Sequence, residues 1–123
     1  MKLTKAELLA AIGRDDTIEN CDLGGLDLSG TDLSGARFEN VSFRNTDLTG
    51  ARIRRTGFKR CDFFGAVLSG VDLTKVLWMR MELRGAILKG AILHQAVLSG
   101  ADLTGADLSG ADLSRAVMDN ARL

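Results

Sequence analysis

The sequence predicts an all-β solenoid, a fold in which short extended pieces coil around one axis. From Cys21 to Asn120 the 123-residue chain divides into 20 consecutive units of five residues without an insertion. The third residue of every unit, here called the centre, is large and apolar. A period of five fits neither a single helix, where five residues advance about 140° beyond a full turn, nor a single strand, where an odd period alternates faces. A chain that turns one corner per unit would bring all centres to one axis.

Each position of the unit has an expected role. The first residue is Ala in ten units, the second is Asp in nine, and the fifth is Gly in eleven. In an extended piece the first and third side chains share a face, so both should point inward while the second points outward. We expect the fourth and fifth residues to form the corner, where glycine supplies backbone angles that other residues avoid. The aspartates are expected to accept hydrogen bonds from backbone or hydroxyl groups at these corners.

Units such as Ala101–Gly105, Ala106–Gly110 and Ala111–Arg115 read A-D-L-x-x and resemble the pentapeptide repeat family. The resemblance covers about 103 of the 123 residues. It implies a right-handed quadrilateral β-helix with four units per coil, so that residues twenty apart stack and the 20 units form about five coils. Two aromatic columns would then run through the interior, one with Phe38, Phe58 and Trp78 and the other with Phe43 and Phe63.

The first part of the chain departs from the repeat, and we expect residues 1–20 to form a short capping helix and a leading segment before a β-helix over 21–123. Thr4 and Glu7 make a capping-box pattern, which is typical of a helix start. The predicted helix covers about Lys5–Ile12. It would close the first coil with an apolar side formed by Leu8, Leu9 and Ile12.

The two ends of the repeat leave alternatives open. Asp16–Asn20 is in phase with the repeat and can be interpreted as a degenerate unit. At the other end the chain stops within a unit at Leu123, with no polar segment to cover the last coil. One interpretation is end-to-end association through that coil, which would give a homodimer. The other is a frayed or shortened terminus.

Charge and hydropathy exclude several classes of protein. The chain has 16 Lys and Arg against 16 Asp and Glu, so its formal net charge is zero, which argues against a dedicated nucleic-acid binder. It has no run of 18 apolar residues, so no transmembrane helix is predicted. The start, Met1–Lys5, lacks the apolar stretch of a signal peptide. We therefore expect a cytoplasmic protein that does not associate with membranes.

Outward positions on one predicted face carry apolar residues, and three of these residues stand at second positions, where the repeat usually places Asp. We call this set the apolar row; it consists of Leu77, Met79, Val97 and Val117, with Arg60 and Arg80 beside it. Exposed apolar patches often mark interaction sites, so the row predicts a surface for an unidentified protein partner. The alternative is structural, because Val and similar residues suit strands and can shield neighbouring strand bonds.

Charged residues also align when residues twenty apart are stacked. An acidic ladder is formed by Asp22, Asp62, Glu82 and Asp102. A basic edge is formed by Arg52, Arg54, Arg55 and Lys59. Some members of the resembled family imitate DNA and bind DNA gyrase. The acidic ladder is consistent with this function, whereas the zero net charge is not, because imitation of DNA needs a dominant negative charge. Direct nucleic-acid binding by the basic edge is disfavoured because its one aromatic, Phe58, is a buried centre.

The residue types that carry catalysis or bind metals are sparse and scattered. Cys21 and Cys61 fall in one column about 10 Å apart, so they are predicted to be buried free thiols. His94 lies at an outward position with no partner to orient it, and Phe64 is the one outward-facing Phe. Small first-position side chains beside large centres should fill the narrow interior completely. We therefore predict no enzyme activity, no cofactor and no metal site.

Overall fold

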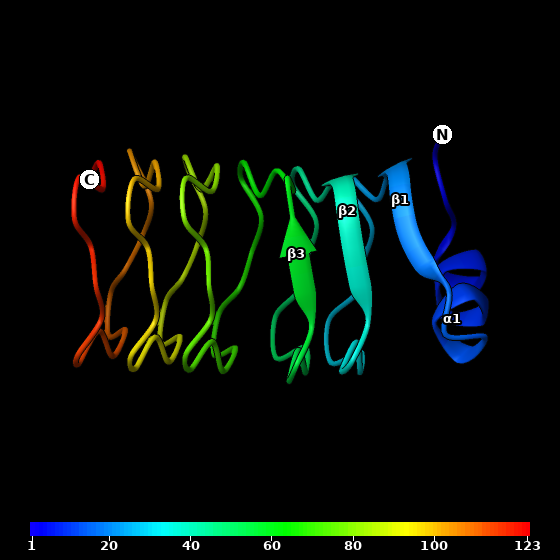
Figure 1. Ribbon diagram of the computed structural model, residues 1–123, viewed down its shortest axis with the longest axis horizontal. Helices are drawn as coiled ribbons and strands as arrows, with labels where there is room; N and C mark the ends of the chain where they lie inside the picture. Colours follow the sequence, from blue (N-terminus) through cyan, green and yellow to red (C-terminus); the bar gives the residue numbers. More distant parts are fainter.

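The computed structural model describes residues 1–123, and it shows the expected solenoid. Its regular elements in chain order are helix α1 (Lys5–Gly13) and strands β1 (Thr17–Asp22), β2 (Arg37–Ser42) and β3 (Gly57–Lys59). The strands form one parallel sheet in the order β1-β2-β3. Beyond β3 the chain continues as isolated parallel bridges between short extended pieces. Figure 1 shows the coils side by side along the long axis, with α1 at one end and the C-terminus at the other.

The pairing register is twenty residues, as the resemblance implied. Ile18 lies opposite Phe38, and Phe38 lies opposite Phe58. One coil therefore contains four units, and second positions stack into four outer faces. The first face runs through Asp22 and Asp102, the second through Asp27 and Asp107, the third through Asp32 and Asp112, and the fourth through Arg37 and Val117.

Backbone angles at the fifth positions make the corners. The eleven glycines there have φ between 64° and 77°, in the left-handed region that glycine enters without strain. The other fifth positions adopt the same region, for example Asn40 at 55° and Arg55 at 55°. All nine second-position aspartates accept a hydrogen bond from the backbone N–H two residues later, at 2.7–3.1 Å. The expected corner chemistry is thus present in the structure.

The interior is one continuous apolar cluster of 30 buried residues. Its aromatic columns contain parallel rings: Phe43 and Phe63 stack at 4.8 Å with 1° between their planes, and Phe38 and Phe58 stack at 5.4 Å with 8° between theirs. Such stacking matches the spacing between neighbouring strands, about 4.8 Å, so these rings fit the normal coil repeat. Trp78 departs from this arrangement, with consequences described below.

Helix α1 begins where the capping box predicts and is one residue longer than expected. The Thr4 hydroxyl accepts a hydrogen bond from the Glu7 N–H, and the Glu7 carboxylate accepts one from the Thr4 N–H. Leu8 is fully buried against the core, whereas Leu9 is 40% exposed, so the apolar side of the helix is narrower than predicted. Strand β1 begins at Thr17, which places the degenerate unit Asp16–Asn20 largely within the parallel sheet.

Candidate functional site

Pairing between neighbouring coils is interrupted at one place. In the regular pattern a centre N–H donates across the coil boundary, as from Leu33 to Arg52 O at 2.7 Å and from Leu73 to Ile92 O at 2.6 Å. Between residues 51–60 and residues 71–80 no such hydrogen bond is formed. We call these segments the first edge and the second edge. On the third and fourth faces, the parallel bridges that join neighbouring coils elsewhere are also missing between the two edges.

The interruption affects two faces and spares the other two. On the second face Leu48 donates to Val67 O at 2.7 Å, and on the first face Phe63 donates to Glu82 O at 2.9 Å. On the edges, the backbone N–H groups of Ile53, Arg55 and Leu77 have no hydrogen-bond partner in the protein. The solenoid is therefore held together along one side and split along the other.

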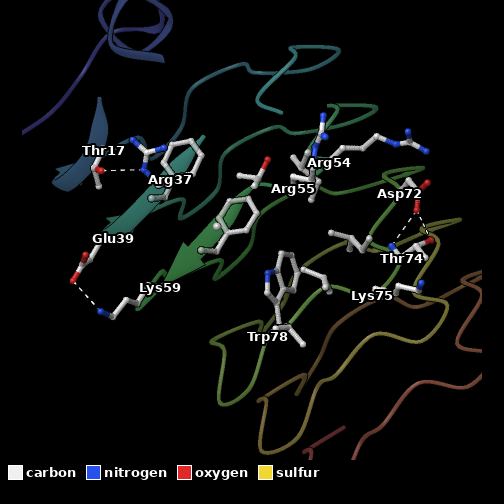
Figure 2. A pocket seen from close by; sticks show the side chains of 18 residues that line it. Thr17, Arg37, Glu39, Arg54, Arg55, Lys59, Asp72, Thr74, Lys75 and Trp78 are labelled. Carbon is white, nitrogen blue, oxygen red and sulfur yellow. Dashed lines mark hydrogen bonds and ion pairs between the residues drawn. The ribbon is translucent and has the colours of Figure 1, made fainter. Parts of the chain in front are cut away.

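A cavity of about 1180 Å³ occupies the split, and we call it the cleft. Both edges and the neighbouring strands line it, as Figure 2 shows. The lining residues are Thr17, Arg37, Phe38, Glu39, Ile53, Arg54, Arg55, Thr56, Gly57, Phe58, Lys59, Asp72, Leu73, Thr74, Lys75, Val76, Leu77 and Trp78. The prediction of a completely filled interior did not anticipate this opening.

Trp78 supplies a physical reason for the split. Its ring stands at 84° to that of Phe58, with 5.7 Å between centroids, whereas the Phe38 and Phe58 rings are nearly parallel. We interpret this change of ring orientation as the contact that keeps the two edges apart. Phe63, whose ring centroid is 5.2 Å from that of Phe58, stacks on the indole at 4.8 Å. The coils stay paired there.

The indole also leaves a polar group unsatisfied inside the protein. Trp78 is 1% exposed, and its Nε1 is a buried side-chain polar atom without a hydrogen-bond partner. Leaving such a donor unpaired costs about 1–3 kcal/mol. In Figure 2 the indole nitrogen is on the side of the ring that faces β3, across the cleft.

Gly57 widens the cleft at the start of β3. A Cβ atom at this position would meet nothing within 4 Å, and the backbone angle of Gly57 is outside the left-handed region. The glycine is therefore not required by its conformation. Its missing side chain leaves a hollow in the fourth face beside Arg37, the preceding residue of this column.

The predicted basic edge separates into paired and unpaired members. Arg52 lies 3.8 Å from Asp32, and Lys59 lies 3.5 Å from Glu39. Arg54 and Arg55 form no ion pair. Both line the cleft.

Lys75, on the second edge, adds a third lining cation without an ion pair. The nearby carboxylate is Asp72, whose pKa is lowered mainly by hydrogen bonds from Thr74 and also by the charge of Arg54. The cleft therefore has a positive rim.

The apolar row lies along the fourth face next to the cleft. Parallel bridges join Leu77 to Val97 and Val97 to Val117, so these residues are aligned on successive coils. Leu77 is 68% exposed, Met79 is 61% exposed and Val117 is 43% exposed. Leu77 belongs both to the row and to the lining of the cleft. The two flanking arginines, Arg60 and Arg80, are exposed, and Arg60 pairs with Glu39.

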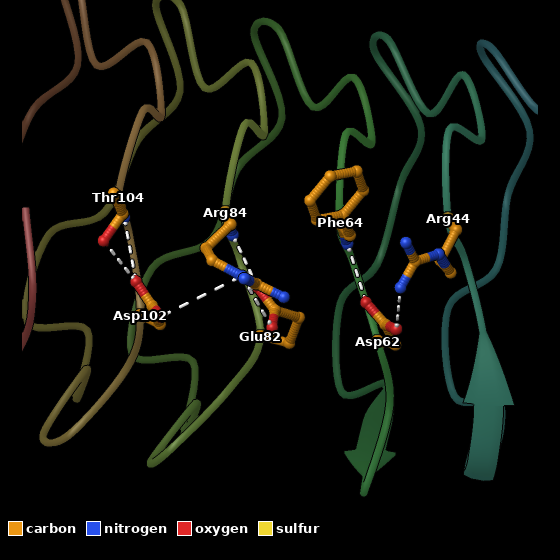
Figure 3. A network of polar contacts seen from close by, with 7 residues as sticks. All are labelled: Arg44, Asp62, Phe64, Glu82, Arg84, Asp102 and Thr104. Atoms are coloured by element: carbon orange, nitrogen blue, oxygen red, sulfur yellow. Dashed lines mark hydrogen bonds and ion pairs between the residues drawn. The ribbon is translucent and has the colours of Figure 1, made fainter.

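The acidic ladder is aligned on the first face, but basic side chains accompany it. Arg44 lies 3.0 Å from Asp62, and Arg84 lies 3.0 Å from Glu82 and 3.9 Å from Asp102 (Figure 3). At the terminal end of the ladder Asp22 lies 3.9 Å from Lys2. Much of the negative charge of this face is thus locally balanced.

Phe64 is part of this arrangement and is not an isolated surface aromatic. The Arg44 guanidinium lies 4.4 Å from the Phe64 ring centroid, and that of Arg84 lies 5.5 Å away. The three residues are twenty apart in sequence and belong to one column. Stacking the sequence at this register could have revealed both arginines, because each stands at the fourth position of its unit.

The remaining reactive side chains are accounted for by the fold. Cys21 and Cys61 are free and buried, as predicted. Burial raises the pKa of the Cys61 thiol to about 11, which leaves little reactive thiolate near neutral pH. The His94 ring is held by Ser114, with 2.7 Å between Nδ1 and Oγ. No helix of the structure has the length and hydropathy needed to cross a bilayer.

Comparison with known proteins follows the repeat. The model of the family described as pentapeptide repeats matches eight copies, over residues 21–60, 45–77, 61–100 and 96–123. Among curated proteins, none matches the sequence at a significant level.

Solved structures show the same type of fold. A pentapeptide repeat protein from the Arabidopsis thaliana thylakoid lumen is 30% identical, with a TM-score of 0.69, over 75% of this chain and 64% of that one. The chain thus spans less than two thirds of that protein. A pentapeptide repeat protein from Nostoc is 27% identical, with a TM-score of 0.70, over 91% of this chain and 96% of that one. A trypsin-treated form of QnrB1, a plasmid-mediated fluoroquinolone resistance protein, is 24% identical, with a TM-score of 0.55, over 85% of this chain and 71% of that one.

Proposed function

We propose that this chain, which belongs to the pentapeptide repeat family, is a non-catalytic scaffold that binds a protein partner through its outer faces. Pentapeptide repeat proteins are generally structural or non-catalytic scaffolds. Nearly the whole chain is used to build the solenoid. What distinguishes it from a plain repeat is the set of side chains on the fourth face, and this set supports a contact with the partner on that face.

The apolar row is the observation that carries this proposal. Leu77, Val97 and Val117 occupy second positions, where nine other units have Asp, and their alignment makes one continuous strip. Fully burying a side chain of this size stabilises a complex by about 1.5–3 kcal/mol. A strip of apolar residues flanked by Arg60 and Arg80 is the composition of a partner surface, with an apolar centre and a polar rim.

A paired set of variants tests the row. The double variant Leu77→Asp, Val97→Asp should lose the partner recovered by the wild-type protein from its source lysate. The matched control is Ile87→Asp, Ile92→Asp, which changes exposed second positions on the second and third faces, 37% and 39% exposed. Circular dichroism of both variants checks folding. Equal recovery by the wild type and the first variant would refute the assignment of this surface.

A second candidate function is imitation of DNA towards DNA gyrase. The aligned ladder of Asp62, Glu82 and Asp102 supports it, and QnrB1 provides a likeness at the level of the fold. The pairing of Arg44 and Arg84 with the ladder weakens it, because imitation of a phosphate backbone needs an unbalanced negative field. A gyrase supercoiling assay with titrated protein separates the two functions. We expect no effect at micromolar protein, and inhibition or protection would favour the second.

For the scaffold itself we propose a right-handed, four-sided β-helix of about five coils. The twenty-residue register over residues 21–120 and membership of the family support this description. A crystal structure would test the hand and the number of coils directly.

A further inference from the structure

We propose that the cleft binds an extended, acidic peptide segment of the partner, which adds to the split solenoid as a strand. This inference rests on the proposed function and specifies the form in which a partner is recognised. The cleft is larger than a typical small-molecule site of about 300–1,000 Å³, and strand edges line it on both sides.

Unpaired backbone groups provide the first argument. Ile53 and Arg55 on the first edge, and Leu77 on the second edge, have N–H groups without a partner. Equivalent groups at the regular interfaces between coils are paired, for example Leu73, which donates to Ile92 O at 2.6 Å. Open strand edges are templates for pairing with another chain, and addition of a peptide strand is a recurrent mode of recognition. Here two such edges face one cavity, so an inserted segment could pair with either edge.

The unsatisfied indole nitrogen provides an independent argument. Trp78 Nε1 is buried, unpaired and part of a side chain that lines the cleft. A peptide carbonyl or an acidic side chain in the cleft offers the acceptor that this donor lacks. Water would need several polar partners to stay ordered at such a site, and the indole is packed against the rings of Phe58 and Phe63.

The charges that line the cleft indicate the chemistry of the segment. Arg54 and Arg55 on the first edge and Lys75 on the second carry no ion pair. Two carboxylates also line the cleft, Asp72 and Glu39, and Glu39 is already paired with Lys59 and Arg60. The complementary ligand is therefore acidic. Leu77, 68% exposed at the rim, favours an apolar residue next to it. Alternation of acidic and apolar residues satisfies both, because neighbouring side chains of a strand point in opposite directions.

Synthetic peptides provide the probe. We would titrate the full chain with an eight-residue peptide of alternating Glu and Val, capped at both ends. Two comparison peptides have Lys in place of Glu, or the same side chains on an N-methylated backbone, which cannot donate to edge carbonyl oxygens such as those of Ala51 and Asp72 that accept no backbone hydrogen bond. Trp78 is the one tryptophan of the chain, so its fluorescence reports directly on the cleft. We expect a saturable spectral change with the Glu peptide, and binding at least tenfold weaker for each of the other two.

Two variants localise the binding. Gly57→Ile fills the hollow without strain, because its Cβ has open space and β3 tolerates a β-branched residue. It should abolish binding while leaving the thermal midpoint unchanged or higher. Arg54→Glu, Arg55→Glu should weaken binding at least tenfold. Arg115→Glu is the matched control, because Arg115 occupies the same corner three coils after Arg55 with φ at 58°, and it should bind like the wild type.

The outcomes separate this inference from the proposed function. The expected pattern of peptide and variant effects would support strand addition. Absence of binding up to millimolar Glu peptide, equal binding of the N-methylated peptide, or tighter binding of a single-stranded oligonucleotide would overturn it. Because partner recovery through the apolar row is measured with Leu77→Asp, Val97→Asp, the proposed function can survive that result. If the wild type and the variant Leu77→Asp, Val97→Asp recovered the partner equally, both the proposed function and the strand-addition inference that rests on it would be refuted.

Discussion

The four corners of the first and second edges carry long basic side chains, whereas most corners carry glycine. They are Arg55, Arg60, Lys75 and Arg80, with φ between 53° and 61°. The left-handed conformation costs a non-glycine residue about 1–2 kcal/mol. Strained residues often persist where function requires them, and two of these residues, Arg55 and Lys75, line the cleft. We interpret these corners as positions where a basic side chain lowers the free energy of unfolding but places a positive charge near the cleft.

Replacing one of these residues by glycine should therefore stabilise the protein. We predict that Arg55→Gly raises the free energy of unfolding by about 1 kcal/mol, because glycine relieves the strain at φ 55° and Arg55 has no ion pair to lose. Urea denaturation measures the change. Asn45→Gly, at φ 58°, is the control and should gain less, because Asn tolerates this conformation. An equal or larger gain at Asn45 would contradict the argument.

The second-position aspartates predict how stability depends on pH. Hydrogen bonds from the side chain and the backbone N–H two residues later hold the pKa of six of them below the ordinary value: Asp27, Asp32, Asp72, Asp102, Asp107 and Asp112. A lowered pKa in the folded state stabilises the protein above the unfolded-state pKa of about 3.9. This contribution is lost as pH falls below that value through the folded-state pKa.

We therefore expect the thermal midpoint to be level from about pH 5 to pH 7 and to fall below about pH 4. The variant Asp107→Asn should show a smaller fall, because Asn does not titrate. Melting curves recorded by circular dichroism across this range make the comparison. A midpoint that rises on acidification would show that these carboxylates do not stabilise the fold.

Among the elements, those set by local sequence were predictable. Thr4 and Glu7 fix the start of α1 because capping depends on residues three apart. The parallel pairing follows from a repeat that places like residues at like positions. The cleft is different, because it depends on how the ring of Trp78 lies against Phe58, and that packing spans twenty residues. Two features of the sequence could have indicated the cleft: a glycine within a strand, Gly57, and the one tryptophan among the centres.

Trp78 is thus the residue that decides whether the two edges pair. We predict that Trp78→Leu lets them close, because Leu at the next centre of this column, Leu98, is compatible with regular pairing in its coil. The Ile53 amide should then become protected from hydrogen exchange, as Leu33 is expected to be. Leu73→Val, a reduction at a neighbouring centre, controls for general loosening. An Ile53 amide that stays as exchangeable as in the wild type would show that another contact holds the cleft open.

At the scale of the whole molecule, the solenoid is a chain of nearest-neighbour interfaces of unequal strength. Each regular interface is continuous around the coil, whereas the interface between the two edges is formed on two faces only. In a repeat protein the free energy of unfolding is approximately a sum over repeats and the interfaces between them, so the split interface contributes the least. Composition and period predicted the stack, and aligned columns predicted the apolar row. Neither distinguishes one interface from the next, since that difference lies in side-chain orientation.

Hydrogen exchange of individual amides tests the interrupted solenoid most directly. The account predicts slow exchange at Leu28, Leu33 and Leu73, which donate across coils at 2.6–2.7 Å. It predicts exchange on the order of 100-fold faster at Ile53, Arg55 and Leu77, whose N–H groups have no partner. Protection of these three amides at the level of Leu33 in the free protein would mean that the edges pair and no cleft exists. Both the cleft and the strand-addition proposal would then be wrong.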